Sequence, residues 1–266
     1  MTDDIKRPVF ICGTGRCGTT LLALMLDSHP NFMSGPEIKI LQPTAGLWWR
    51  IQDEMLKFLA PYNYDLNDLN SSFRVLLSSF FNKRNFQGRV VEQTPLNLET
   101  MGILSNIFPD AQFIHLIRDG RDVACSLKSQ HWDFTGAPYD PTENFTNAAT
   151  YWVELIRRAK EVARTYLNDA TYYEFRYEKL VSEPELEMTK LLEFLGEPYD
   201  ESVIKYYEYE HTFSTNTKIP QNGIYKSALS RWKKEFTKSD AEMFDTIAGE
   251  LLIELDYEKD HSWVNF

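Results

Sequence analysis

The sequence is poor in cysteine and in positive charge, and each shortage argues against a class of protein. Its three cysteines, Cys12, Cys17 and Cys125, are too few for a disulfide-stabilised fold and lack the spacing of metal ligands. We therefore expect no metal site and a reducing compartment. With 28 Lys and Arg against 39 Asp and Glu, the formal net charge is −11. This balance disfavours nucleic acid as a partner, because general nucleic-acid binding depends on a basic surface.

Long apolar runs are also missing. No stretch approaches the roughly 18 consecutive apolar residues of a membrane-spanning helix. The start, MTDDIKRPVFICG, is acidic, and its apolar run is too short for a signal peptide. What the chain does have is 43% hydrophobic and 14% aromatic residues, enough for a sizeable core. We expect one soluble, cytoplasmic domain over residues 1–266.

Short apolar runs alternate with helical patterns along the chain. Strands are predicted at 7–13, 88–93, 111–117 and 170–177. Helices are predicted at 19–29, 97–108, 119–130, 147–168, 230–236 and 240–255. This alternation predicts an α/β fold with three layers, in which helices cover both faces of a mostly parallel, P-loop-like sheet.

Three segments fall outside this pattern. Residues 45–85 are predicted to form a helical, aromatic-rich insert over the sheet edge. Residues 131–146 and 210–225 lack periodicity, so we expect loops that border a site on the substrate side.

The stretch FICGTGRCGTTLLALML has the glycine spacing of a nucleotide-binding loop but not its lysine. Gly13 and Gly18 bracket four residues, and the position that carries lysine in nucleotide triphosphatases is Thr19. With a strand before it and a helix after it, the loop can direct the backbone amides of residues 15–20 at an anion, and Arg16 adds a cation. We predict phosphate binding without a lysine–Mg²⁺ clamp on a γ-phosphate. The alternative is a turn that only reverses the chain.

Cys17 is also a candidate nucleophile, because a cysteine at a helix start can have a lowered pKa. However, no arginine follows any of the cysteines at the six-residue offset of a phosphatase loop. We expect Cys17 to contribute its backbone amide instead.

A second candidate anion site lies in HLIRDGRDVACSLKSQ. Arg118 follows a predicted strand, at the end where parallel sheets bind ligands. Ser126 comes about two helical turns later, so both side chains can converge on one phosphate. The alternative is a surface Arg–Asp network within RDGRD, worth about 0–1 kcal/mol.

GTGRCGTTLLALMLDSHP together with FIHLIRDGRDVACSL resembles the paired signatures of sulfotransferases that use 3′-phosphoadenosine-5′-phosphosulfate (PAPS). The resemblance is strongest to the branch with tyrosylprotein and bacterial carbohydrate sulfotransferases. It implies PAPS as co-substrate and no metal. By this resemblance the first motif binds the 5′-phosphate through Arg16, Cys17, Gly18, Thr19 and Thr20, and the second binds the 3′-phosphate through Arg118 and Ser126. Weaker matches suggest contacts of Tyr177 and Lys226 with the nucleotide and an anchoring role for Trp232, although Tyr177 and Trp232 are equally typical of core aromatics.

The implied reaction is an in-line displacement in which an acceptor hydroxyl, or less readily an amine, attacks the sulfur and adenosine 3′,5′-bisphosphate (PAP) leaves. Arg16 would stabilise the charge on the leaving oxygen. Glu37, with Lys39 nearby, is the candidate general base, since the tyrosylprotein branch has a glutamate at this place. The alternatives are that Glu37 caps the following helix and that His29 is the base. We expect His29 to bond backbone at a helix end and His115 to be buried.

Two positions depart from the family pattern. Cys17 stands where serine is usual, and Gln93 stands before Thr-Pro where related enzymes often have lysine. Either Arg16 and Lys226 suffice at the transition state, or another residue such as Lys39 substitutes.

The acceptor itself is left open as a small molecule, a carbohydrate or a peptide. Candidate aromatics for its pocket, which can equally be core residues, are Trp48, Trp49, Trp132 and Tyr139. A small-molecule kinase with a degenerate loop and a non-catalytic nucleotide-binding module are the competing functions.

Overall fold

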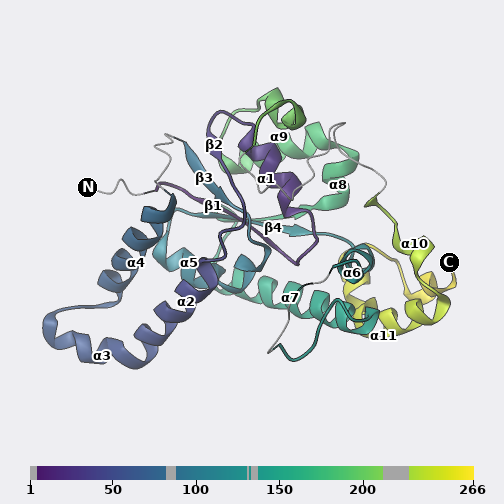
Figure 1. The fold of residues 1–266 in the computed structure, drawn as a ribbon, viewed down its shortest axis with the longest axis horizontal. Coiled ribbons are helices and arrows are strands. Elements are labelled where there is room, and N and C mark those ends of the chain that lie inside the picture. Colours follow the sequence, from purple (N-terminus) through teal and green to yellow (C-terminus); the bar gives the residue numbers. More distant parts are fainter. Residues whose placement is uncertain (1–4, 82–87, 131, 133–136, 212–227) are drawn as a thin grey trace.

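The computed structural model describes residues 5–81, 88–130, 132, 137–211 and 228–266. Its centre is a five-stranded sheet in the order β2-β3-β1-β4-β5, with every neighbouring pair parallel (Figure 1). The strands are β1 (Val9–Gly13), β2 (Phe32–Met33), β3 (Arg89–Glu92), β4 (Gln112–Ile117) and β5 (Tyr172–Arg176). The four predicted strands are confirmed. The two-residue β2 was not predicted, because so short a strand carries no periodicity of its own.

Eleven α-helices connect and cover the strands within the described residues. They are α1 (Thr19–Asp27), α2 (Leu41–Arg50), α3 (Leu56–Leu59), α4 (Leu66–Phe81), α5 (Met101–Ile107), α6 (Gly120–Lys128), α7 (Phe145–Tyr166), α8 (Tyr177–Ser182), α9 (Pro184–Leu195), α10 (Trp232–Glu235) and α11 (Lys238–Glu254). Each predicted helix is present with ends shifted by a few residues, whereas α8 and α9 were not predicted. No helix of the described residues is long and apolar enough to cross a bilayer.

The two faces of the sheet are covered by different helices, as the three-layer prediction requires. Val9 and Ile11 of β1 pack with α1, α8 and α9, while Phe10 and Cys12 pack on the other side with α2, α4, α5 and α7 (Figure 1). This split follows from the strand itself, because successive side chains point to opposite faces. Both faces are therefore apolar, which explains why β1 reads as one continuous hydrophobic run.

Within its described part, residues 45–81, the insert predicted over the sheet edge is helical. Leu69, Phe73 and Leu77 of α4 are buried in the same cluster as Phe10 and Phe113, so α4 covers a face of the sheet. The reason is the spacing of these three residues, which forms one apolar stripe along the helix.

A third core cluster joins α6, α7, α10 and α11 beyond the end of β4. Trp152 on α7 lies at its centre, fully buried, and its indole donates a hydrogen bond to the carbonyl of Arg118 (3.0 Å). Leu155 on the same helix is buried as well. This cluster fixes α6, and with it the second predicted anion motif, against the end of the sheet.

Candidate functional site

The two predicted anion motifs lie side by side at the carboxyl edge of the sheet. β1 ends at Gly13, which is paired in register with Leu116 of β4. The loop from Gly13 to Thr19 and the segment from Ile117 to Gly120 therefore leave neighbouring strands in the same direction. This is the position at which open parallel sheets bind ligands.

The glycine loop has the backbone of an anion-binding turn. Arg16 (φ 71°) and Gly18 (φ 107°) both adopt left-handed conformations, and the amide of Cys17 donates to the carbonyl of Thr14 (3.3 Å). No side chain caps the start of α1, so its first amides keep their hydrogen-bonding capacity for a ligand. Such alternation of backbone conformation directs successive amides toward one point.

Two glycines are required here by close packing. A Cβ atom on Gly13 would lie 2.5 Å from both the sulfur of Cys17 and the carbonyl oxygen of Leu116. A Cβ atom on Gly18 would lie 2.5 Å from the ring of Tyr177. The loop is thus pressed between β4 and α8, and Tyr177, which is buried, belongs to its wall.

Arg16 and Arg118 form one cluster with Ser126. The Nε of Arg16 donates to the hydroxyl of Ser126 (3.0 Å), and Nη1 of Arg118 donates to the carbonyl of Arg16 (3.0 Å). Nη2 of Arg118 donates to the carbonyl of Ala228 (2.7 Å), and its guanidinium lies 4.6 Å from the ring centre of Tyr177. Arg118 and Ser126, which we predicted to converge on one phosphate, both contact Arg16.

The cluster carries positive charge, and among the described residues no carboxylate is directly paired with it. Neither Arg16 nor Arg118 forms an ion pair within the described part of the chain, and Nε of Arg118 is buried there without a hydrogen-bond partner. Partial desolvation of Arg16 lowers the pKa of its guanidinium, and the charges of Arg118 and, more weakly, Arg231 lower it further. Cations held close together without a carboxylate favour a bound anion.

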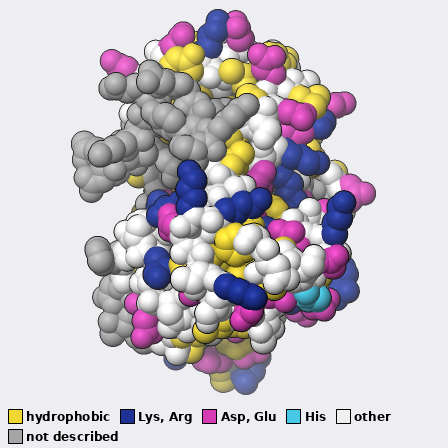
Figure 2. All heavy atoms as spheres, turned by 90° about the vertical axis from the view of Figure 1, so that its right-hand side faces the viewer, with side chains coloured by type: hydrophobic (Ala, Val, Ile, Leu, Met, Phe, Trp, Pro, Cys, Tyr) yellow, Lys and Arg dark blue, Asp and Glu magenta, His cyan; other side chains and the backbone are white. Residues whose placement is uncertain are grey.

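A basic area is visible on this side of the molecule although the chain is acidic overall. Lys and Arg side chains gather across the middle of the face that carries α10 and the C-terminal helices (Figure 2). The sequence did not predict Arg231 as part of this basic area. The feature that points to it is its position next to Trp232.

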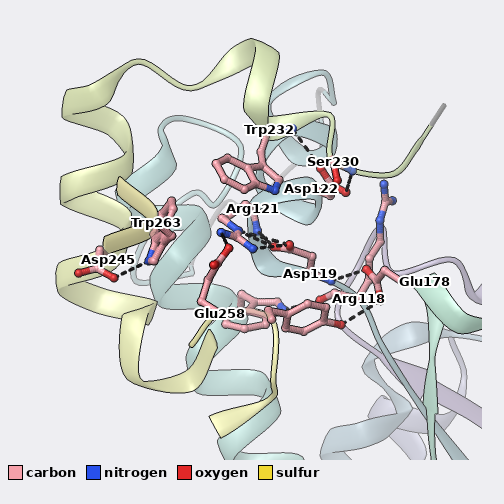
Figure 3. A network of polar contacts seen from close by, with 12 residues as sticks. Arg118, Asp119, Arg121, Asp122, Glu178, Ser230, Trp232, Asp245, Glu258 and Trp263 are labelled. Atoms are coloured by element: carbon pink, nitrogen blue, oxygen red, sulfur yellow. Dashed lines mark hydrogen bonds and ion pairs between the residues drawn. The ribbon is translucent and has the colours of Figure 1, made fainter. Parts of the chain in front are cut away.

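The alternative of a surface Arg–Asp network is wrong. Arg121 and Asp119 are buried and paired (2.8 Å), Arg121 also pairs with Glu258, and its guanidinium lies 4.0 Å from the ring centre of Trp232 and 4.7 Å from that of Trp263 (Figure 3). The network is enclosed because α10 and the C-terminal segment close over α6.

Asp122 connects the same region to the site. Its carboxylate accepts the amides of Ser230 (2.8 Å) and Trp232 (3.1 Å), so the start of α10 is fixed to α6 (Figure 3). Trp232 is buried, which fits both its predicted anchoring role and its alternative as a core aromatic. This attachment also positions the Ala228 carbonyl that Arg118 contacts. Lys226 lies outside the described residues.

Glu37 lies in the segment between β2 and α2. Its carboxylate is 3.7 Å from Nζ of Lys39, and the side chain is 34% exposed. The helix-cap alternative is wrong, because α2 starts at Leu41 and no side chain caps it. The charge of Glu37 acts against the lowering of the Arg16 pKa, which shows that the carboxylate is within electrostatic reach of the guanidinium.

His29 is buried, and both its ring nitrogens are occupied: Nδ1 accepts the amide of Asn31 (3.1 Å), so Nε2 donates to the carbonyl of Pro198 (2.9 Å). This confirms its predicted role in bonding backbone. His115 is fully buried, and burial lowers its pKa to about 3. Both nitrogens of His29 are occupied and His115 is enclosed in the core, so neither ring is placed to take a proton from an acceptor.

Gln93 is buried between the glycine loop and the Glu37 segment. Its Oε1 accepts from the hydroxyl of Thr20 (3.5 Å), and its Nε2 donates to the carbonyl of Gly35 (3.3 Å). The adjacent Glu92 accepts the amide of Ile38 (3.3 Å). Two side chains at the end of β3 thereby fix the backbone on both sides of Glu37.

Cys17 is fully buried, and burial raises the pKa of its thiol to about 12. This excludes the thiolate nucleophile, as expected.

Of the candidate pocket aromatics, Trp132 lies beside the cluster. Its ring centre is 5.9 Å from Cζ of Arg16. Trp48 is buried and bonds Asn70, Trp49 is exposed, and the hydroxyl of Tyr139 donates to Glu154. Sequence reasoning missed Tyr151, whose hydroxyl accepts the amide of Gly15 (3.1 Å).

Within the described residues no group of three or more His, Cys, Asp and Glu side chains is arranged to hold a metal ion.

Residues 8–201 match the family described as "Sulfotransferase family". Protein-tyrosine sulfotransferases of Drosophila melanogaster and Danio rerio are 29% and 30% identical over 79% and 75% of this chain, which correspond to 44% and 56% of their own lengths. An uncharacterised protein of Aquifex aeolicus is 27% identical over 86% of this chain and 31% of its own length. The chain therefore spans between about a third and just over half of the length of these relatives.

Solved structures show the same fold. The sulfotransferase domains of the Curacin biosynthetic pathway and of the Synechococcus PCC 7002 olefin synthase superpose with TM-scores of 0.64 and 0.62 at 21% identity, covering 94% and 93% of this chain and 98% of each domain. A mouse sulfotransferase solved with PAP superposes with a TM-score of 0.54 at 15% identity over 92% of this chain and 84% of that one.

Proposed function

Because the chain belongs to the sulfotransferase family, we propose that it transfers a sulfonate group from PAPS to an acceptor hydroxyl or amine and releases PAP. The observation that carries the proposal is the Arg16–Arg118 cluster beside the uncapped start of α1. Two cations and a set of backbone amides, with no carboxylate paired to either arginine in the described residues, suit a ligand with several negative charges.

The residues fit the two phosphates of one adenosine nucleotide. We assign the 5′-phosphosulfate to the glycine loop, with Arg16, the amides of Cys17 and Gly18, and the hydroxyls of Thr19 and Thr20. We assign the 3′-phosphate to Arg118 and Ser126, and here the buried, unpartnered Nε of Arg118 is an available donor. Tyr177 lies against both motifs and is the candidate contact for the nucleoside. Lys226 remains a further candidate phosphate contact.

The chemistry then depends on two charged side chains. As the bond from sulfur to the leaving oxygen breaks, Arg16 and the loop amides stabilise the charge on that oxygen, which is worth on the order of 3 kcal/mol for one fixed donor. Glu37 accepts the proton of the acceptor hydroxyl. Its partial exposure and its proximity to Arg16 support this role. Lys39, paired with Glu37, is a candidate substitute for the lysine that Gln93 replaces.

We leave the acceptor as a small molecule, a carbohydrate or a peptide. Similarity to protein-tyrosine sulfotransferases favours a hydroxyl, but the chain covers only part of those proteins. We also propose a cytoplasmic location, which the three free, buried thiols support.

A ligand panel tests the binding part of the proposal. PAP at a hundred times its dissociation constant should add about 2.7 kcal/mol of stability, which raises the melting temperature by roughly 5 °C or more for a chain of this size. AMP and ATP–Mg²⁺ should have much smaller effects, because AMP lacks the 3′-phosphate and Thr19 cannot replace the lysine that binds a γ-phosphate. Stabilisation by ATP–Mg²⁺ and not by PAP would instead support a kinase.

Turnover separates an enzyme from a nucleotide-binding module. Labelled PAPS is incubated with a panel of sugars, phenols, peptides and lipids, and the wild type is compared with Glu37→Gln and with Glu161→Gln, an exposed glutamate on α7. Loss of transfer in the first variant alone supports Glu37 as base. Equal activity in all three proteins would remove that assignment, and PAP binding without turnover would leave only a binding module.

A further inference from the structure

Tyr151 is the side chain that connects α7 to the glycine loop. It projects from the first half of α7, and its hydroxyl oxygen accepts the amide of Gly15 at 3.1 Å. Gly15 precedes Arg16, so the phenol is fixed beside the residue that we assign to the leaving oxygen.

Two aromatic side chains pack closely around Gly15. A Cβ atom there would lie 2.9 Å from the ring of Trp132 and 3.2 Å from the hydroxyl oxygen of Tyr151. Both aromatic side chains therefore approach the loop backbone closely, on the side to which Arg16 extends, since Cζ of Arg16 is 5.9 Å from the ring centre of Trp132.

The hydroxyl of Tyr151 is protonated and can donate a hydrogen bond. A phenol accepts and donates at the same oxygen, and in Tyr151 the accepting position is taken by Gly15. No acceptor for the phenol proton lies within hydrogen-bond distance among the described residues. Burial raises the pKa of Tyr151 to about 12, so the phenol is neutral at pH 7. The charge of Glu37 contributes to this rise in pKa, so the hydroxyl and the candidate base are within electrostatic reach of each other.

We propose that Tyr151 is a further catalytic residue, whose hydroxyl donates a hydrogen bond to an oxygen of the sulfonate group during transfer while the amide of Gly15 fixes its position. The inference rests on the proposed function. In the reaction the acceptor oxygen forms a bond to sulfur, the bond from sulfur to the 5′-phosphate breaks and its electron pair stays on the phosphate. The acceptor proton moves to Glu37, and the proton of Tyr151 stays on Tyr151.

The test compares Tyr151→Phe with Tyr166→Phe. The first keeps the ring and removes the hydroxyl, and the second makes the same change on an exposed tyrosine at the far end of α7, which packs on Gly102 and not on the loop. For both variants and the wild type, kcat and KM are measured with labelled PAPS, PAP affinity by calorimetry, and melting temperature without ligand.

We expect Tyr151→Phe to lower kcat by about 10- to 100-fold, while PAP affinity and melting temperature stay close to those of the wild type. PAP carries no sulfonate, so its binding does not depend on the proposed contact. Tyr166→Phe should match the wild type in every measurement.

Three other outcomes overturn the inference and are distinct from one another. Unchanged kcat in Tyr151→Phe refutes the role of the hydroxyl and leaves the proposed function intact. Parallel losses of kcat, PAP affinity and melting temperature assign Tyr151 a structural role in holding the loop. A wild type that binds no PAP and consumes no PAPS refutes the proposed function, and the assignment of Tyr151 with it.

Discussion

At the residue scale, Arg16 joins the parts of the candidate site. Its carbonyl accepts from Arg118, its Nε donates to Ser126, and its φ of 71° holds the loop in the conformation that turns the amides toward one side. A left-handed backbone costs a non-glycine residue about 1 kcal/mol or more and is found most often at functional sites. A single residue thus connects both predicted phosphate motifs.

Two substitutions of Arg16 should separate the effect of its positive charge on kcat from the effect of its hydrogen-bonding geometry. We expect Arg16→Ala to lower kcat by about 10²- to 10³-fold, because the donor beside the leaving oxygen is lost. Arg16→Lys keeps the charge but loses the bond from Nε to Ser126, so it should retain part of this activity. Steady-state kinetics with PAPS measure both, with Arg157→Ala, an exposed arginine on α7, as the control. Wild-type rates in Arg16→Ala would contradict the assignment.

Cys17 should be chemically inert in the folded protein. Because burial raises its pKa to about 12, almost no thiolate is present at pH 8. We expect a thiol reagent to modify Cys17 at a rate limited by unfolding, as followed by absorbance and peptide mapping. Cys17→Ser should bind PAP within about threefold of the wild type, since the backbone amide is retained. Rapid labelling of Cys17 in the native protein would count against this description.

At the scale of elements, α6 and the C-terminal segment form one unit. Arg121 lies between Trp232 and Trp263 and pairs with Asp119 and Glu258, while Asp122 holds the start of α10. Removal of one member leaves buried charge without a partner, which is more costly than the net value of the pair.

We therefore expect Arg121→Ala to lower the free energy of unfolding by about 3–5 kcal/mol. Arg121→Met should be less damaging, because it keeps apolar contact with both indoles. Denaturant unfolding measures the difference, and Arg157→Ala, whose side chain is 53% exposed, should change stability by less than about 1 kcal/mol. Equal effects of the three substitutions would show that the buried network contributes nothing.

At the scale of the whole molecule, stability should depend on His115. The ring is fully buried on β4, with Nδ1 bonded to the hydroxyl of Tyr172 (2.6 Å), and burial lowers its pKa to about 3. In the unfolded chain the pKa is near 6.5. Between these values the unfolded state binds more protons than the folded state, so acid favours unfolding.

The contribution of His115 is therefore complete above about pH 6.5 and is lost as the pH falls toward 3. We expect the free energy of unfolding to fall by up to about 1.4 kcal/mol per pH unit below pH 6 from this residue alone. Chemical denaturation at pH 7.5, 6.5, 5.5 and 5.0 measures it, and His115→Gln should flatten the dependence by that amount. The same pH dependence in both proteins would assign the acid sensitivity to other groups.

Local patterns in the sequence were sufficient for the main elements and for the candidate anion loop. The strands that became β1 and β4 are short apolar runs buried on both faces, and Gly13, Arg16 and Gly18 lie within one loop whose geometry depends on neighbouring residues. The position of α4 and the strand β2 were not predictable in this way. The position of α4 depends on which face of the sheet its apolar stripe packs against. The strand β2 depends on the pairing of Phe32 with Arg89 of β3.

The sequence alone thus determined an α/β chain with a lysine-free glycine loop and a second basic motif, because these features depend on spacings of a few residues. Only the tertiary structure decided two hydrogen bonds between distant residues. Arg118 donates to the carbonyl of Arg16, 102 positions away, and the hydroxyl of Tyr151 accepts the amide of Gly15, 136 positions away. Such contacts depend on strand order, helix packing and the absence of a side chain at Gly15. None of these is encoded in a local pattern, so the common site of Arg16, Arg118 and Tyr151 exists only once the sheet and its helices have assembled.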